Sequence, residues 1–107
     1  MVASVLALAA VMAGGRGASG EEKKMKVLVF TGGAIHDGHG IGLSLEATLK
    51  KDDRFEVTRI ENDLEALVAP KLDPFDVVVF EWTVGEITEA QKRGILNAVA
   101  GGKGFVG

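Results

Sequence analysis

Cysteine is absent from the chain, and this absence excludes several kinds of chemistry at once. Without cysteine there is no disulfide, no thiolate nucleophile and no zinc site built on sulfur. A lipoprotein anchor is excluded for the same reason. The absence does not decide the compartment, because a chain without cysteine tolerates oxidising and reducing surroundings alike.

Clustered positive charge is also scarce. The formal net charge is -3, and no run of Lys or Arg is longer than the pair Lys23-Lys24. Nucleic-acid-binding domains need a basic patch or stripe to neutralise phosphates. We therefore expect no nucleic acid among the partners.

The longest apolar run is too short to cross a membrane. Residues 2–13 carry no charge, but a spanning helix needs about 20 apolar residues. The run is typical of the apolar region of a secretory signal peptide, with Val11-Met12-Ala13 as a small-residue cleavage site, although no Lys or Arg precedes it. The alternative is a disordered leader. We expect residues 1–20 to lie outside the folded domain. If they are a signal peptide, the protein is secreted or periplasmic and has no membrane span once the leader is removed. If they are not, we expect a cytoplasmic location.

What remains is enough for one domain of ordinary composition. The chain has 107 residues, of which 47% are hydrophobic and 25% charged, values usual for a soluble globular protein. Short apolar, β-branched runs bounded by turn residues predict buried strands. These runs are 26–30, the more polar and edge-like 55–60, 75–80 and the start of a strand at 104–107.

Helical periodicity appears between these runs. The apolar positions Ile41, Leu45 and Leu49 predict a helix over 41–51. A short helix with Leu64, Leu67 and Val68 follows the second strand, capped by Asn62 or Asp63.

The third helix has the clearest start. Thr88 with Gln91 three residues later forms a capping-box pattern, and Gly101-Gly102 ends the helix. Its predicted apolar face consists of Ile95, Leu96 and Val99.

Alternating strands and helices specify parallel pairing through right-handed crossovers. The predicted fold class is therefore α/β, an open doubly wound and mainly parallel sheet of the flavodoxin-like kind. The last strand has no following helix, so we expect a C-terminally incomplete domain whose uncovered strand favours self-association.

Ligands of such sheets bind at the carboxyl ends of the strands, beside the point where the strand order reverses. The loop after the first strand holds His36, Asp37 and His39, candidates for acid–base catalysis or ligand binding. Gly32 and Gly33 let the backbone approach a ligand closely. A His-x-x-His in a loop lacks the helical i, i+4 geometry of a metal-binding pair, so we expect no metal site.

The loop after the central strand supplies the other candidates. Glu81 is a candidate acid or base, and Trp82 and Thr83 are candidate sugar contacts. Each has a plainer alternative, since Glu81 can be a surface charge and Trp82 can pack beneath the loop. The G-x-G-x-x-G, P-loop and G-x-S-x-G patterns are absent, so dinucleotide, P-loop nucleotide and nucleophile-elbow chemistry are not supported.

Several segments together resemble the ThuA-like domains, named for trehalose utilisation. They are 26–33 followed by His36, 76–80, Trp82-Thr83, 87–93 and 101–107, so that the resemblance covers residues 24–107 as the N-terminal part of such a domain. It implies a fold similar to class I glutamine amidotransferases, but no glutaminase activity, because the nucleophilic cysteine is missing. It also implies a role in carbohydrate metabolism with a small sugar as ligand, and it names no cofactor.

The function follows from the resemblance only as a set of alternatives. The first is an enzyme, active once missing C-terminal residues complete it. The second is a non-catalytic sugar-binding or interaction domain on the same scaffold, since fold does not determine function. The third is a truncated gene product without activity.

Overall fold

The computed structural model describes residues 23–33, 37–83 and 85–107. The predicted leader at 1–20 and the candidate His36 lie outside the described residues. None of the helices in the described ranges is long and apolar enough to span a bilayer.

The strands form one parallel sheet, which confirms the predicted α/β fold class. In the described residues its strands are β1 (Met25–Gly32), β2 (Phe55–Glu61), β3 (Val77–Trp82) and β4 (Gly104–Val106), in the order β2-β1-β3-β4. As its polar residues predicted, β2 lies at an edge. The chain moves outward from β1 to β2 and then returns to the other side of β1 for β3, so the strand order reverses between β1 and β3.

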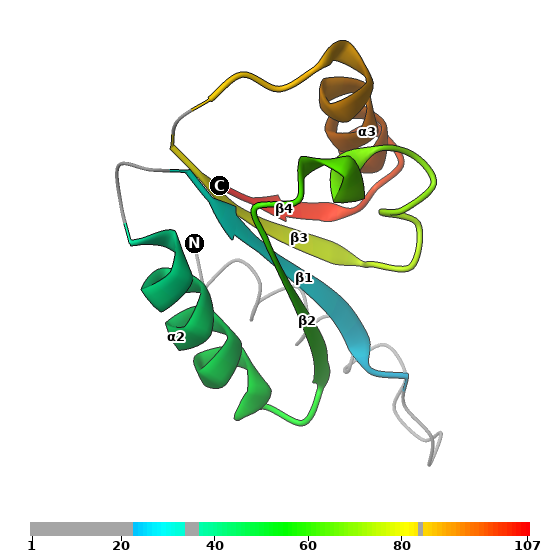
Figure 1. Ribbon diagram of the computed structural model, residues 1–107. Coiled ribbons are helices and arrows are strands. Elements are labelled where there is room, and N and C mark those ends of the chain that lie inside the picture. Colours follow the sequence, from blue (N-terminus) through cyan, green and yellow to red (C-terminus); the bar gives the residue numbers. More distant parts are fainter. Residues whose placement is uncertain (1–22, 34–36, 84) are drawn as a thin grey trace.

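Helices cover both faces of the sheet, as in a doubly wound fold. Helix α2 (Gly38–Lys50) lies on one face, and α3 (Glu89–Ala100) lies with the short 3-10 helix η1 (Leu64–Leu67) on the other (Figure 1). We call these the α2 face and the α3 face. Because successive side chains of a strand point to opposite faces, each strand contributes to both.

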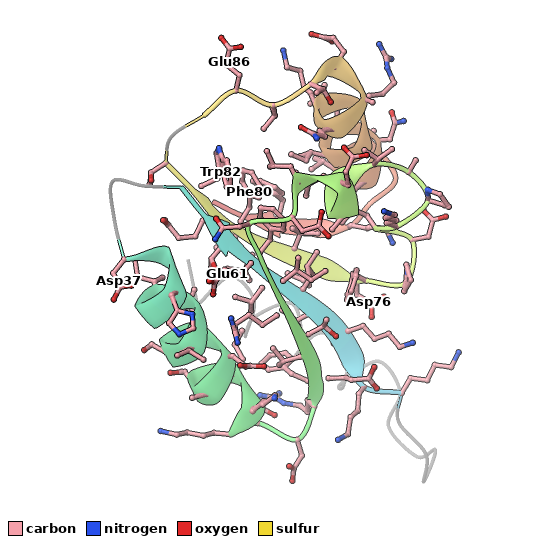
Figure 2. All side chains as sticks on the ribbon, viewed as in Figure 1. Asp37, Glu61, Asp76, Phe80, Trp82 and Glu86 are labelled. Atoms are coloured by element: carbon pink, nitrogen blue, oxygen red, sulfur yellow. The ribbon has the colours of Figure 1, made fainter. Side chains whose placement is uncertain are left out.

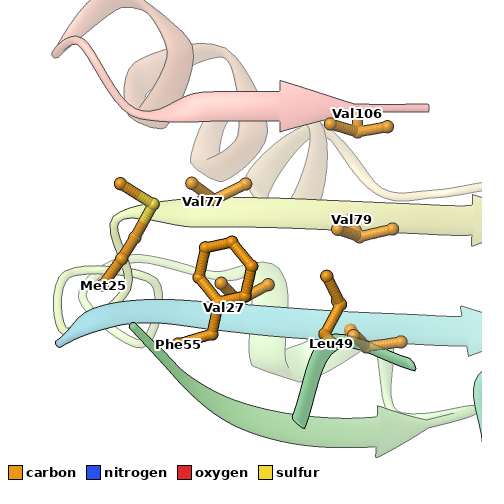
Figure 3. Close-up of a cluster of buried hydrophobic side chains, with 8 residues drawn as sticks. Met25, Val27, Leu49, Phe55, Val77, Val79 and Val106 are labelled. Atoms are coloured by element: carbon orange, nitrogen blue, oxygen red, sulfur yellow. The ribbon is translucent and has the colours of Figure 1, made fainter. Parts of the chain in front are cut away.

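The core of the α2 face is aliphatic apart from one ring. Figure 3 shows it as a layer of side chains from all four strands with Leu49 of α2 above them. Leu45 of α2 and Val57 of β2 pack against this layer. The buried residues of the cluster are Met25, Val27, Val29, Leu49, Phe55, Val77, Val79 and Val106.

The core of the α3 face contains stacked aromatic rings. The ring of Phe30 lies 5.4 Å from that of Phe80 and 6.1 Å from that of Trp82, measured between centroids. Phe30 is fully buried. Aromatic pairs at such distances contribute beyond the area they bury, so this face is closed by apolar packing up to the last residue of β3.

Helix α3 meets η1 at a point with no room for a side chain. A Cβ atom on Gly94 would overlap the carbonyl oxygen of Leu67. The residues of α3 that face inward are therefore Gln91, Gly94, Ile95 and Ala98. The predicted apolar face was wrong in part: Leu96 and Val99 are exposed, at 59% and 47%, because the close contact at Gly94 sets the rotation of the helix.

The predicted capping box at the start of α3 is confirmed. Thr88 Oγ1 accepts from the backbone N–H of Gln91, and Gln91 Oε1 accepts from the N–H of Thr88 at 2.9 Å. Gln91 is itself buried, and its Nε2 donates to Glu65 Oε2 of η1. Of the two predicted caps for η1, Asp63 is the one observed, accepting from the N–H of Glu65.

Candidate functional site

Three polar residues form a row across the carboxyl edge of the sheet. Thr31 of β1 is in register with Glu61 of β2 on one side and with Glu81 of β3 on the other. Thr31 lies two residues beyond Val29 and Glu81 two beyond Val79, so the row continues the α2 face. We call Glu61, Thr31 and Glu81 the polar row.

Helix α2 comes close to the middle of this row. A Cβ atom on Gly42 would lie 2.9 Å from Thr31 Oγ1 and 3.3 Å from Arg59 Cδ. A glycine at this position therefore lets the helix approach β1 and β2, and Thr31 is fully buried beneath it. The first turn of α2 is thereby held beside the polar row.

Three buried oxygen atoms at this edge have no hydrogen-bond partner among the described residues. They are Thr31 Oγ1, Glu81 Oε1 and Thr83 Oγ1, from the carboxyl ends of the adjacent strands β1 and β3. Buried polar atoms are nearly always paired, and an unpaired one costs about 1–3 kcal/mol. Their concentration at the switch point of the sheet marks this edge as the candidate functional site.

A network of ion pairs surrounds Glu61. Its Oε1 lies 2.8 Å from His39 Nδ1 of α2 and accepts from Arg59 Nη1 at 2.9 Å. Arg59 Nε donates in turn to Glu46 Oε1 at 3.1 Å. Hydrogen bonds from Lys50 and from Arg59 hold the pKa of Glu46 below its usual value. The predicted ligand-binding residue His39 is thus connected to the polar row through Glu61.

Asp37 has a structural task in this arrangement. Its side chain caps α2, with Oδ1 accepting from the N–H of Gly40 at 3.0 Å. Figure 2 shows Asp37 at the start of α2. A carboxylate at this position also complements the helix dipole. The predicted catalytic role of Asp37 stays a prediction, as does that of His36, which lies outside the described residues.

The glycines after β1 allow close contacts. A Cβ atom on Gly32 would overlap the ring of Trp82 and lie 2.6 Å from Asn62 Oδ1. Gly33 has a φ of 93°, a value that favours glycine. Gly32 therefore lets the end of β1 pack against Trp82 of β3 and Asn62 after β2.

The structure separates Trp82 from Glu81. Trp82 packs with Phe30 and Phe80 on the α3 face, and its Nε1 donates to the carbonyl of Gly85 at 3.3 Å. Figure 2 shows Trp82 and Phe80 on the opposite side of the sheet from Glu61. The predicted candidates therefore fall into two groups, with Glu81 and His39 on the α2 face and Trp82 on the other.

Sequence reasoning missed Glu61 and Arg59. The segments chosen at strand ends followed the first and third strands only, whereas Glu61 ends β2. The rule that selected Glu81 applies equally to the last residue of the edge strand, so a signal for Glu61 was present. No group of three or more potential metal ligands occurs among the described residues, a range that leaves out His36.

The model of the protein family ThuA, described as trehalose utilisation, matches residues 26–107. The chain belongs to the ThuA family. The match includes every strand residue of the sheet except Met25, so the polar row lies entirely within the ThuA region. Trehalose utilisation is thereby the role indicated at the family level. No curated protein and no solved structure matches the chain.

Proposed function

We propose that this ThuA domain binds a small sugar of the trehalose type at the polar row and acts on it by acid–base chemistry. Glu81, at the β3 end of the row, is the first proposed acid or base. His36 and Asp37, in the loop that precedes α2, are the other proposed acid–base residues. The observation that carries the proposal is Oε1 of Glu81, which is buried and has no hydrogen-bond partner among the residues that the structure describes.

A sugar can supply the hydrogen-bond donor that Glu81 Oε1 lacks in the described part of the chain. Each hydroxyl group of a sugar both donates and accepts a hydrogen bond, whereas an ionised carboxylate only accepts. A hydroxyl placed against Glu81 Oε1 would supply the missing donor. The oxygen of Thr83 offers a second contact on the same strand end.

Trp82 supports the site from the other face. Its ring covers Gly32, and its Nε1 holds the turn at Gly85. Stacking of a sugar on the partly exposed ring remains a prediction. If it occurs, the sugar extends around the carboxyl edge from the α2 face to the α3 face.

The test uses trehalose and the variant Glu81→Gln. The variant keeps the shape of the side chain but removes its acid–base function, so we expect trehalose to bind while product formation falls by 10²-fold or more, roughly the contribution of one general acid or base. Calorimetry measures the binding and chromatography of the incubation mixture measures the product. Glu86→Gln, a change at an exposed Glu beyond β3, is the matched control. Equal turnover by Glu81→Gln and by the wild type would remove Glu81 from the chemistry.

A non-catalytic sugar-binding domain is the second candidate. The capping bond that Asp37 Oδ1 accepts from the N–H of Gly40 favours it, because this carboxylate already has a structural partner. Under this alternative, trehalose binds to the wild-type protein and no product forms during long incubation. The same two measurements therefore separate the candidates.

A further inference from the structure

We infer that Glu61 is a positioning residue that orients His39, so that Nε2 of His39 acts as a proton acceptor for a sugar hydroxyl at the polar row. The inference rests on the proposed function for the identity of the ligand. It adds a second acid–base group, opposite Glu81, and a partner that orients it.

The contact between the two side chains decides which ring nitrogen carries the proton. His39 Nδ1 lies 2.8 Å from Glu61 Oε1. Since a carboxylate oxygen accepts and does not donate, Nδ1 must carry the hydrogen. In the neutral ring Nε2 then has a free lone pair, and the hydrogen bond at one nitrogen determines the role of the other.

Glu61 is itself held in place. Arg59 Nη1 donates to the same oxygen at 2.9 Å, and Arg59 is fixed from its other side by Glu46. The Arg59 and Glu61 side chains are only 24% and 28% exposed, whereas that of His39 is 62% exposed. The support is therefore partly buried and rigid, while the ring that it orients can meet a ligand.

The distance between the two ends of the polar row is similar to the length of a disaccharide. Neighbouring parallel strands lie about 4.8 Å apart, so the Cα atoms of Glu61 and Glu81 are separated by about 10 Å across β1. A disaccharide that is hydrogen-bonded to Glu81 and passes the carboxyl end of β1, beyond the Thr31 side chain that α2 covers, extends toward the His39 side. One ligand can thus contact both acid–base groups.

The proposed step is a proton transfer. The O–H bond of a sugar hydroxyl breaks, its electron pair stays on the oxygen, and the proton forms a new bond with Nε2 of His39. The ring becomes positively charged, and the carboxylate of Glu61 at Nδ1 stabilises that charge. The N–H bond at Nε2 breaks again when the proton returns to a sugar oxygen, so the neutral ring is restored.

The test is the tautomer of His39 in the whole chain, measured by ¹⁵N NMR without any sugar. Spectra are recorded at increasing alkaline pH until the ring ¹⁵N shifts stop changing, so that the neutral ring is observed. We expect the Nδ1–H form in the wild type. Glu61→Gln keeps an acceptor and should keep this tautomer, whereas Glu61→Ala should lose the preference. His39→Gln assigns the signal, since the chain has only one other histidine.

Glu46→Gln is the matched control. It alters a carboxylate of the same network that does not contact His39, so the tautomer should not change. A wild-type ring with its hydrogen on Nε2 would overturn the inference even if the Glu61→Ala variant failed to fold. An Nδ1–H tautomer that persists in a folded Glu61→Ala variant would also overturn it. Because no sugar is present, this result is independent of whether trehalose binds.

Discussion

The two faces of the sheet differ at its carboxyl edge, although the same strands build both. On the α3 face, the carboxyl halves of β1 and β3 carry Phe30, Phe80 and Trp82, and the ring of Phe30 packs against the other two. On the α2 face, the neighbouring residues Thr31 and Glu81 bring oxygen atoms that have no partner in the described part of the chain. One face closes the core, and the other keeps polar groups unpaired at a cost in stability. Such a cost at the switch point of a parallel sheet is what a ligand site requires.

Loss of the Phe30 ring should have the largest effect on stability. Phe30→Ala removes a fully buried aromatic side chain from the α3 face and leaves a cavity. We expect the free energy of unfolding to fall by about 4 kcal/mol. Urea denaturation followed by circular dichroism measures it. A loss below about 1 kcal/mol would show that the aromatic packing does not hold this face together.

Inserting a side chain into the contact between α3 and η1 should have the next largest effect on stability. A side chain on Gly94 has no room against the carbonyl of Leu67, so Gly94→Ala should destabilise the fold by about 3 kcal/mol, despite the helix preference of alanine. Asn97→Ala, an exposed change on the same helix, is the control and should alter stability by less than about 0.5 kcal/mol. Similar thermal unfolding midpoints for the two variants would contradict the packing of α3 described here.

Replacing Thr31, the residue after Phe30, should raise the stability instead of lowering it. Thr31→Val removes a buried hydroxyl that has no partner among the described residues, and it keeps the shape of the side chain. We expect stability to rise by about 1 kcal/mol. Trehalose binding, measured by calorimetry, should weaken at the same time. Lower stability in this variant would mean that the hydroxyl is satisfied in solution and that the α2 face carries no such cost.

The smallest expected effect on stability is at the amino-terminal edge of the sheet, away from the aromatic rings and from the polar row. Hydrogen bonds from the side chain and the backbone N–H of Arg54 lower the pKa of Asp52 from 3.8 to about 2. Because the folded pKa lies below the ordinary one, the stabilisation is fully present above pH about 3.8 and is lost as the pH falls through about 2. Asp52→Asn should thus be slightly less stable than the wild type at neutral pH, and the difference should vanish in acid. Denaturation curves at several pH values measure it, and a constant difference down to pH about 2 would contradict the assignment.

Local patterns in the sequence predicted the fold well. The β-branched runs predicted the strands, and the Thr88–Gln91 capping box predicted the start of α3. The rotation of α3 was not predictable in the same way. Leu96 and Val99 match a helical apolar stripe, but the contact at Gly94, which only the folded structure reveals, turns them toward solvent.

The residues of the candidate site were also predicted only in part, because their positions depend on how far β3 extends and how α2 packs. The carboxyl-end rule identified Glu81 and His39, but the sequence alone did not show that β3 continues to Trp82. Because the strand continues, alternation sends Glu81 and Trp82 to opposite faces. Glu61 and Arg59 were missed because they belong to an edge strand, and their relation to His39 depends on how α2 packs.

Chemical-shift mapping with trehalose tests the central claim, that the polar row on the α2 face is the ligand site, most directly. Trehalose is titrated into the wild type and into Glu81→Leu, which keeps a side chain of similar size but removes both carboxylate oxygens. We predict shifts of the backbone amides at the carboxyl ends of β1, β2 and β3 and in the first turn of α2, and their loss in the variant, which stays folded. Equal shifts in both proteins, or shifts confined to α3 and η1, would contradict the account.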